Sequence, residues 1–124
     1  MNKAKIEILT HPVYETAQSK PEQNKYFFSY RIQIRHISGE GCQLINRHWL
    51  ITDATGQKQE VFGEGVVGQK PELSEGEEFT YTSGVLLDTP VGTMEGYYEM
   101  LGASGDKFRV PIKPFLLAVP GAIN

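Results

Sequence analysis

Apolar and polar side chains alternate most clearly over residues 26–35. Tyr26, Phe28, Tyr30, Ile32 and Ile34 share one side of this segment, and mostly polar residues occupy the other. A period of two residues is typical of a β-strand with one buried face. We therefore predict a long strand here, with its apolar side toward the core.

Similar patterns predict strands over residues 6–14, 42–52, 59–62, 78–83, 94–101 and 107–112. Pro12 cannot donate a backbone hydrogen bond, so we place the first of these at a sheet edge. Turn residues at 36–41 and 53–56 favour hairpins between the strands on either side of them. No segment has the apolar spacing of a helix, and the pattern therefore indicates an all-β fold. We predict an immunoglobulin- or fibronectin type III-like antiparallel β-sandwich of about seven strands.

Residues 42–52 break the simple alternation, because neither face of this strand is uniformly apolar. Either the strand is central and covered on both sides, or a β-bulge near residues 46–48 switches the face that points inward. Trp49 is the expected core anchor, since a sandwich of this kind places a large aromatic in its third strand. The apolar segment 115–119 would form an unusual exposed patch, so we expect it to pack on the body or across a dimer.

Length and charge limit the function classes. The 124 residues fit a single domain, 1–124, large enough for its own core. A formal charge of −3 gives no general attraction to nucleic acid or anionic membranes, and the longest apolar run is far shorter than the about 20 residues of a spanning helix. The single cysteine, Cys42, and an N-terminus without an apolar signal core favour a cytoplasmic protein.

Residues 62–68 have the glycine spacing G-x-G-x-x-G of a phosphate-binding loop. In dinucleotide-binding folds this spacing opens a helix whose N-terminus holds the phosphates, but no helical pattern follows here. An anion would then be held by turn amides alone. The alternative is structural: the glycines permit positive φ in a bulge or tight turn, while Val66 and Val67 pack.

The candidate anion-binding residues are Gly63, Gly65, Gly68, Lys70 and Arg47. Glu64 places a negative charge in the loop, which Lys70 would offset. Arginines on the neighbouring strands would add bidentate anion contacts if they lie near the loop; these are Arg31, Arg35 and Arg47.

The sequence shows no recognisable set of catalytic or metal-ligating residues. His11, His36 and His48 have no recognised ligand spacing, and Asp53 and Asp88 lie in predicted turns, where carboxylates bond nearby backbone amides. Cys42 has no histidine at a spacing that indicates a nucleophile. We therefore expect no catalytic residue, no metal site and no cofactor.

Several motifs together resemble the bacterial ApaG family over nearly the whole chain. They lie at residues 26–32, 47–53, 63–68, 81–84, 87–90, 94–100 and 110–115. The resemblance implies a fibronectin type III-like sandwich and a genetic association with cobalt and magnesium resistance or efflux. It also implies a pyrophosphate-binding role proposed for the glycine motif, which maps onto Gly63, Gly65 and Gly68. Similar domains in eukaryotic F-box proteins and in a DNA polymerase-interacting protein resemble protein-recognition modules.

These observations favour a non-enzymatic binding domain that recognises a protein partner or a pyrophosphate-like anion through the glycine loop and the neighbouring sheet edge. The alternative is a phosphate- or nucleotide-handling enzyme, although such hydrolysis usually needs clustered carboxylates or a positioned base. A direct divalent-metal carrier is a third possibility, without ligand pairs to support it.

Overall fold

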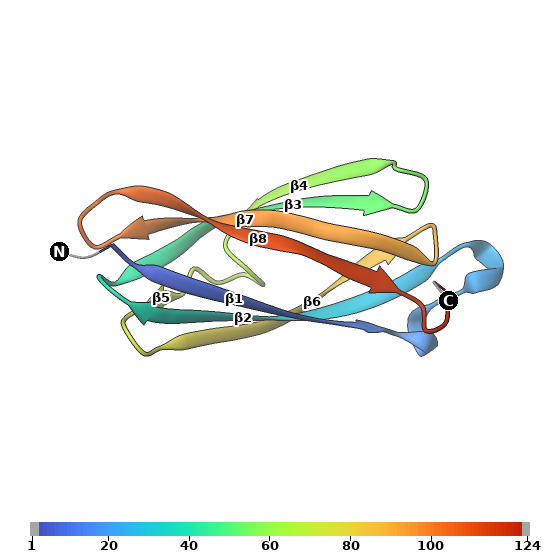
Figure 1. The fold of residues 1–124 in the computed structure, drawn as a ribbon, viewed down its shortest axis with the longest axis horizontal. Helices are drawn as coiled ribbons and strands as arrows, with labels where there is room; N and C mark the ends of the chain where they lie inside the picture. The colour runs from blue at the N-terminus through green and yellow to red at the C-terminus, as the bar shows by residue number, and fades with distance from the viewer. Residues whose placement is uncertain (1–2, 123–124) are drawn as a thin grey trace.

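A computed structural model describes residues 3–122, so the ends of the expected domain 1–124 lie outside the described residues. Two antiparallel sheets face each other and form the predicted β-sandwich (Figure 1). One sheet has the order β1-β2-β6, and the other has the order β4-β3-β7-β8 with β5 also paired to β3. The strands are β1 (Lys5–Tyr14), β2 (Tyr26–Ser38), β3 (Cys42–Asp53), β4 (Lys58–Glu64), β5 (Glu72–Leu73), β6 (Glu78–Leu87), β7 (Val91–Gly102) and β8 (Lys107–Ala118).

Helical structure in the described part of the chain is limited to two short 3-10 turns, η1 (Thr16–Gln18) and η2 (Pro21–Gln23). None of the helices within residues 3–122 has the length and apolar character needed to cross a membrane. The predicted strands are all present, and β5 adds a two-residue strand that the sequence pattern did not indicate. Pro12 lies on β1, which is an edge strand as expected.

The predicted hairpin between β2 and β3 is wrong. These strands lie in different sheets, because the link at residues 39–41 carries the chain across the sandwich. Gly39 makes this crossing at φ +97°, and a Cβ there would lie 2.1 Å from the carbonyl oxygen of Lys3. Turn residues therefore mark the end of β2 correctly without showing which sheet the next strand joins. The expected β3–β4 hairpin is confirmed.

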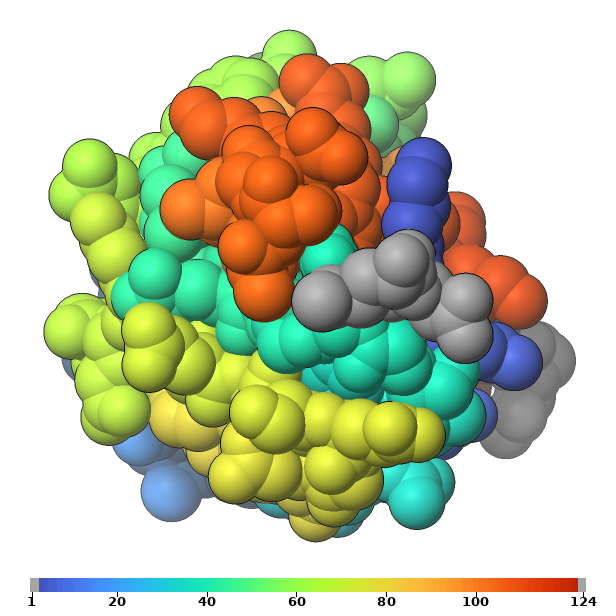
Figure 2. Space-filling model, turned by 90° about the vertical axis from the view of Figure 1, so that its left-hand side faces the viewer, coloured from blue at the N-terminus to red at the C-terminus, as the bar shows by residue number. Residues whose placement is uncertain are grey.

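Turns from both sheets meet at one end of the sandwich. Figure 2 shows this end, with the β7–β8 turn in orange, the β2–β3 link in teal and the segment before β6 in yellow. The amide of Ala103 donates to the carbonyl of Gly41 over 2.9 Å, and the Ser104 hydroxyl donates to Glu40 over 3.0 Å. These contacts fasten the β2–β3 link to the β7–β8 turn at this end.

The core lies between the two sheets. Trp49 is 3% exposed and packs edge-on against Tyr30, Tyr98 and Phe115, with ring centroids 5.5, 6.4 and 5.9 Å away. Its predicted role as a core anchor is confirmed. The apolar segment 115–119 also packs on the body as expected, but most of it is the last part of β8, with Leu117 fully buried.

Candidate functional site

A β-bulge in β3 is the base of the glycine loop, which we define as residues 63–68. The pairing of β3 with β7 shifts between Leu44 and Asn46, so the inward side of β3 changes from Cys42 and Leu44 to Trp49 and Ile51. The bulge alternative for this strand is therefore confirmed, with the bulge at Ile45, just before the predicted residues 46–48. The carbonyl of the bulged Ile45 accepts the amide of Gly65 over 2.7 Å, which anchors the loop to β3.

The tip of the loop is a tight turn over residues 66–69. The amide of Val66 donates to the carbonyl of Gln69 over 2.8 Å, and the amide of Gln69 donates back over 2.9 Å. Val67 and Gly68 both have positive φ, +44° and +79°, as a type I′ turn requires. Val66 is fully buried and plugs the side of the core, whereas Val67 is 52% exposed. The tight turn with positive φ that the structural alternative expects is therefore present, and Val66 packs as expected, but Val67 does not.

Arg47 clamps the loop from β3. Its Nη1 donates to the carbonyls of Glu64 and Gly65, each over 3.0 Å. Gly63 pairs with Arg47 across the two strands, and a Cβ on Gly63 would lie 2.6 Å from Nη1. The guanidinium therefore occupies the space that a side chain at position 63 would need.

The structure brings all five candidate anion-binding residues to one corner of the sandwich, but many of their groups already have partners. The amide of Gly65 is bonded to Ile45, and Lys70 lies 3.6 Å from the Glu64 carboxylate. Of the amides between residues 65 and 69, those of Val67 and Gly68 are the two without a backbone acceptor in the described chain. The other two arginines considered, Arg31 and Arg35, lie on β2 in the opposite sheet, where Arg35 pairs with Glu7 and Glu78.

A polar cavity of about 310 Å³ opens beside the loop, between the two sheets. Tyr30, Tyr81 and Ser83 line it together with Arg47 and Glu64. Behind it the buried hydroxyls of Tyr81 and Tyr98 are hydrogen-bonded to each other. Burial raises the pKa of both tyrosines far above the ordinary value, and it also raises the pKa of Tyr30. These groups are therefore neutral hydrogen-bonding hydroxyls, and Arg47 is the cationic group at the cavity wall.

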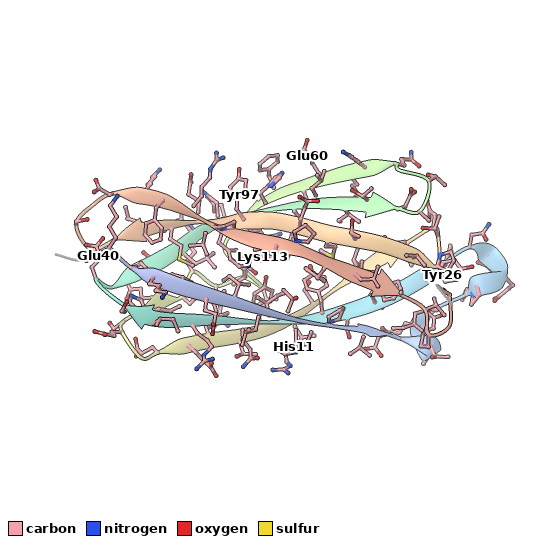
Figure 3. All side chains as sticks on the ribbon, in the orientation of Figure 1. His11, Tyr26, Glu40, Glu60, Tyr97 and Lys113 are labelled. Atoms are coloured by element: carbon pink, nitrogen blue, oxygen red, sulfur yellow. The ribbon has the colours of Figure 1, made fainter. Side chains whose placement is uncertain are left out.

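The outer face of the five-stranded sheet carries a row of aromatic rings that sequence reasoning missed. His48 on β3 lies between Phe62 on β4 and Tyr97 on β7, with ring centroids 4.5 and 4.7 Å away, and Arg109 on β8 places its guanidinium carbon 4.3 Å from the Tyr97 ring centroid. We call Phe62, His48 and Tyr97 the aromatic row. Figure 3 shows Tyr97 and Glu60 extending from this face. Phe62, at the open edge, is 68% exposed.

The three histidines come from three different strands and make separate contacts. His11 Nε2 lies 2.7 Å from Gln33 Oε1, His36 Nε2 donates to the Glu40 carbonyl over 2.6 Å, and His48 Nε2 donates to Glu60 over 2.8 Å. Within residues 3–122, no group of three or more His, Cys, Asp or Glu side chains is placed to hold a metal ion.

Asp53 has the expected role in a turn. Its Oδ1 accepts hydrogen bonds from the Thr55 hydroxyl and amide and from the Gln57 amide, at 2.7 to 3.0 Å. The Thr55 hydroxyl is the main cause that lowers the pKa of this carboxyl. Asp53 therefore stabilises the β3–β4 turn.

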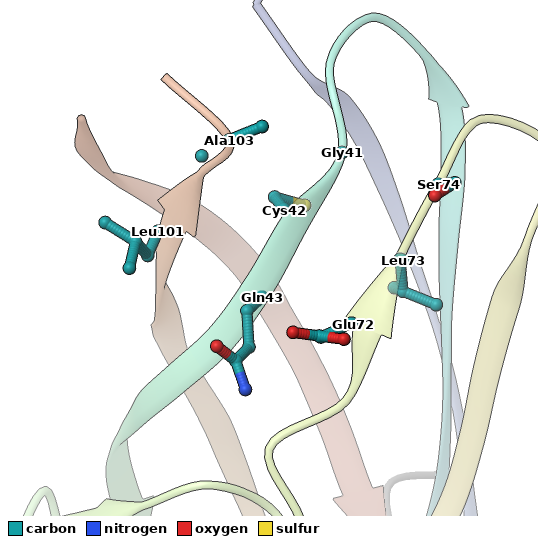
Figure 4. Close-up of a pocket in the computed structure, with 9 residues that line it drawn as sticks. Gly41, Cys42, Gln43, Glu72, Leu73, Ser74, Leu101 and Ala103 are labelled. Carbon is teal, nitrogen blue, oxygen red and sulfur yellow. The ribbon is translucent and has the colours of Figure 1, made fainter. Parts of the chain in front are cut away.

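Cys42 lies in a separate cavity of about 400 Å³ between β3, β5 and β7 (Figure 4). Its thiol is buried and lies 3.7 Å from the Met100 sulfur, and burial raises its pKa. A thiol in this state is a poor nucleophile.

Comparison with known proteins gives one consistent result. A model of the ApaG domain matches residues 16–102. The Protein ApaG of Vibrio vulnificus is 49% identical over all 124 residues and 98% of its own length, and that of Sodalis glossinidius is 47% identical over all of this chain and 99% of its own. The crystal structure of a putative ApaA protein from Bordetella pertussis superposes with a TM-score of 0.93 at 46% identity, over 96% of this chain and 97% of that one. This chain therefore belongs to the ApaG domain family.

Proposed function

We propose that this chain is a non-enzymatic binding domain that recognises a protein partner through β4 and the adjoining glycine loop. The observation that carries the proposal is the exposure of Phe62 at the end of the aromatic row, on a strand with no neighbour on its outer side among the described strands. Exposed aromatic side chains on a fixed scaffold are typical anchors of protein interfaces.

The rigidity of the corner supports the same proposal. Arg47 and the Ile45 carbonyl hold the loop on one side, and the buried Val66 holds it on the other. A surface that is fixed before binding loses less conformational entropy when a partner arrives. Phe62 and Val67 are therefore displayed on a preformed surface.

A pyrophosphate-like anion is the second candidate ligand. The cavity of about 310 Å³ with Arg47 in its wall and the amides of Val67 and Gly68 nearby favour it, whereas Glu64 in the same wall opposes a negative charge. In this proposal the anion would contact these groups, and the amides of Gly65 and Val66, which already have acceptors, would contribute nothing. The Lys70 ammonium would reach the anion only after leaving Glu64.

We also propose that the association with cobalt and magnesium resistance or efflux depends on the protein partner. We further propose a cytoplasmic location, and we expect neither nucleic acid nor a membrane as a partner, because the formal charge is −3.

Site-specific crosslinking tests the protein-binding proposal. A photoreactive benzoylphenylalanine replaces Phe62 in one protein and Thr82 in a control protein, since Thr82 is exposed on the opposite sheet. We expect protein adducts in a bacterial lysate at position 62 that unlabelled parent protein suppresses and a Phe62→Ala protein does not. Equal adducts at both positions would refute the proposal.

A hydrolysis assay tests the enzyme alternative. The purified protein is incubated with Mg²⁺ and either pyrophosphate or a dinucleoside polyphosphate, and we expect no turnover. Hydrolysis that is lost when Asp53 or Asp88 is changed to alanine would establish the enzyme and overturn the binding-domain proposal.

A further inference from the structure

We infer that the partner segment bound at β4 is extended and rich in arginine, and that one of its guanidinium groups stacks on Phe62 between Glu60 and Glu64. This inference rests on the proposed protein-binding function and assigns its chemistry. It follows from the strand register, the contacts of the aromatic row and the charges on either side of it.

The register arranges the outer face of the sheet in three cross-strand rows. Pro111 on β8 follows Tyr97 at the end of the aromatic row. The second row contains Glu64, Asn46, Glu99 and Arg109, and the third contains Glu60, Leu50 and Glu95. Carboxylates therefore lie on both sides of the aromatic rings. In these three rows four glutamates face one arginine, while Lys58 lies in the next row along β4 and Lys113 lies on the part of β8 beside Glu95. The negative charge is therefore concentrated around Phe62, where it is complementary to a cationic side chain.

The sheet already contains one example of the proposed contact. At the inner end of the aromatic row, Arg109 places its guanidinium over Tyr97 at 4.3 Å. At the outer end, Phe62 contacts His48 on one side, and its ring has no arginine or lysine over it among the described residues. A partner guanidinium over Phe62 would repeat at the open end what Arg109 does at the other.

A cavity of about 320 Å³ lies at this place on the surface. Phe62, Tyr97 and His48 line it, and Glu64 and Glu99 lie at its border. Arg47 also lines it, with its Nη1 already bonded to the carbonyls of Glu64 and Gly65. Aromatic walls with a carboxylate border suit the flat guanidinium of arginine, which stacks on rings and bonds carboxylates at the same time. A lysine ammonium matches this shape less well.

The acidic side chains here have exchangeable partners. Glu64 pairs with Lys70 at 3.6 Å, and both side chains are substantially exposed. Glu60 bonds His48 through one oxygen, which leaves its other oxygen free to accept. Exposed pairs of this kind are weak, so a partner arginine can replace or share them at small cost.

The free edge of β4 explains why the partner should be extended. A segment that pairs with β4 continues the sheet and places its alternate side chains in the three rows described above. A second copy of this chain is a poor occupant in the register centred on Phe62, because antiparallel self-pairing there would set Glu60 opposite Glu64. Like charges directly opposite each other destabilise a strand pair.

An amide chemical-shift titration with three matched peptides tests the inference. The first is the blocked heptapeptide Thr-Arg-Val-Arg-Val-Arg-Thr, the second replaces each arginine by the uncharged isostere citrulline, and the third replaces each by glutamate. We expect the arginine peptide to shift the amides of residues 59–64 and to bind more weakly as salt rises, because exposed charges are screened. We expect the other two peptides to leave these residues unshifted.

Variants identify the contacts. Phe62→Ala should weaken binding of the arginine peptide about two- to fivefold, the range for an exposed cation–π contact. Glu60→Gln with Glu64→Gln should weaken it at least about twofold and reduce its salt dependence. Thr82→Ala, on the opposite sheet, should change nothing. All these side chains are exposed, so the variants should fold.

Each other outcome overturns the inference. If the citrulline or glutamate peptide shifts residues 59–64 as strongly as the arginine peptide does, β4 is a binding edge without the inferred charge preference, and the proposed function survives. If the arginine peptide shifts the amides of other residues, or if the amides of β4 shift with protein concentration alone, an arginine-rich segment is not the occupant of this edge. Crosslinking at position 62 then decides separately whether a protein partner exists.

Discussion

The two glycines with positive φ in the loop provide a matched pair of mutations. Gly65 and Gly68 have φ values of +62° and +79°, so alanine is strained at both positions. At Gly65 a Cβ would lie 2.3 Å from the carbonyl oxygen of Gln69, whereas at Gly68 it would meet nothing within 4 Å. The comparison of Gly65→Ala with Gly68→Ala therefore separates backbone strain from close packing of the turn.

The expected magnitudes follow from these contacts. Left-handed backbone costs alanine about 1 to 2 kcal/mol, and the loss of chain entropy in the unfolded state offsets about 0.4 to 1 kcal/mol of this. Gly68→Ala should therefore lower the free energy of unfolding by about 1 kcal/mol. Gly65→Ala must also displace the Gln69 carbonyl, which accepts the Val66 amide, and so disturbs that bond and the burial of Val66. We expect a loss of about 3 kcal/mol.

Urea unfolding of the parent and both variants measures the difference, which should be about 2 kcal/mol. In a thermal melt the same difference should separate the two midpoints by about 8 °C, at about 4 °C per kcal/mol for a domain of this size. If the two variants differ by less than about 0.5 kcal/mol, the contact of Gly65 with the turn carries no energy, and the account of the loop as a tightly built corner is wrong.

Three further predictions concern the core, the buried tyrosines and the anion. Trp49→Ala should lower the free energy of unfolding by about 3 to 5 kcal/mol, because it leaves a cavity among three aromatic rings, and a variant that unfolds like the parent in urea would contradict this. The pKa values of Tyr81 and Tyr98 are raised in the folded state, so the stabilisation from these tyrosines should be complete below about pH 10 and fall at higher pH, where the unfolded chain loses protons that the folded chain retains. Urea titrations between about pH 8 and 11 measure this fall in the free energy of unfolding. An equally steep fall in the Tyr81→Phe/Tyr98→Phe protein would assign the pH dependence to other groups. Pyrophosphate should shift the amides of Val67 and Gly68 with roughly millimolar to tens-of-micromolar affinity that salt weakens, and shifts confined to other residues would remove the loop as an anion site.

Much of the fold could be predicted from the sequence because its signal is local. Alternation in residues 26–35 and the aromatic at Trp49 correctly indicated a buried strand face and a core anchor. The sheet partner of β3 could not be predicted in this way, because the same turn residues serve a hairpin and a crossing between sheets. Only long-range packing decides between them.

The candidate site could also be predicted only in part. The glycine spacing identified the corner, and Arg47 was among the residues named for it. The aromatic row was missed because Phe62, His48 and Tyr97 are distant in sequence and share a face only through the register of three strands. The bulge at Ile45 hid the row further, since it reverses the apparent side of His48 along β3. The apolar side of residues 42–52 changes between the two halves of this segment, and this change was the one signal in the sequence that could have revealed the aromatic row.

The G-x-G-x-x-G spacing has a separate physical cause at each glycine. Gly63 leaves room for the Arg47 guanidinium, Gly65 allows the Gln69 carbonyl to approach, and Gly68 supplies the second positive φ of the turn. Three independent structural requirements therefore produce a spacing that resembles a phosphate-binding motif. A ligand at this corner must use the groups that these requirements leave free, which are the amides at the tip of the turn and the exposed ring of Phe62. The exposed ring lies on the open edge strand β4, and this combination favours the proposed protein partner over a small anion.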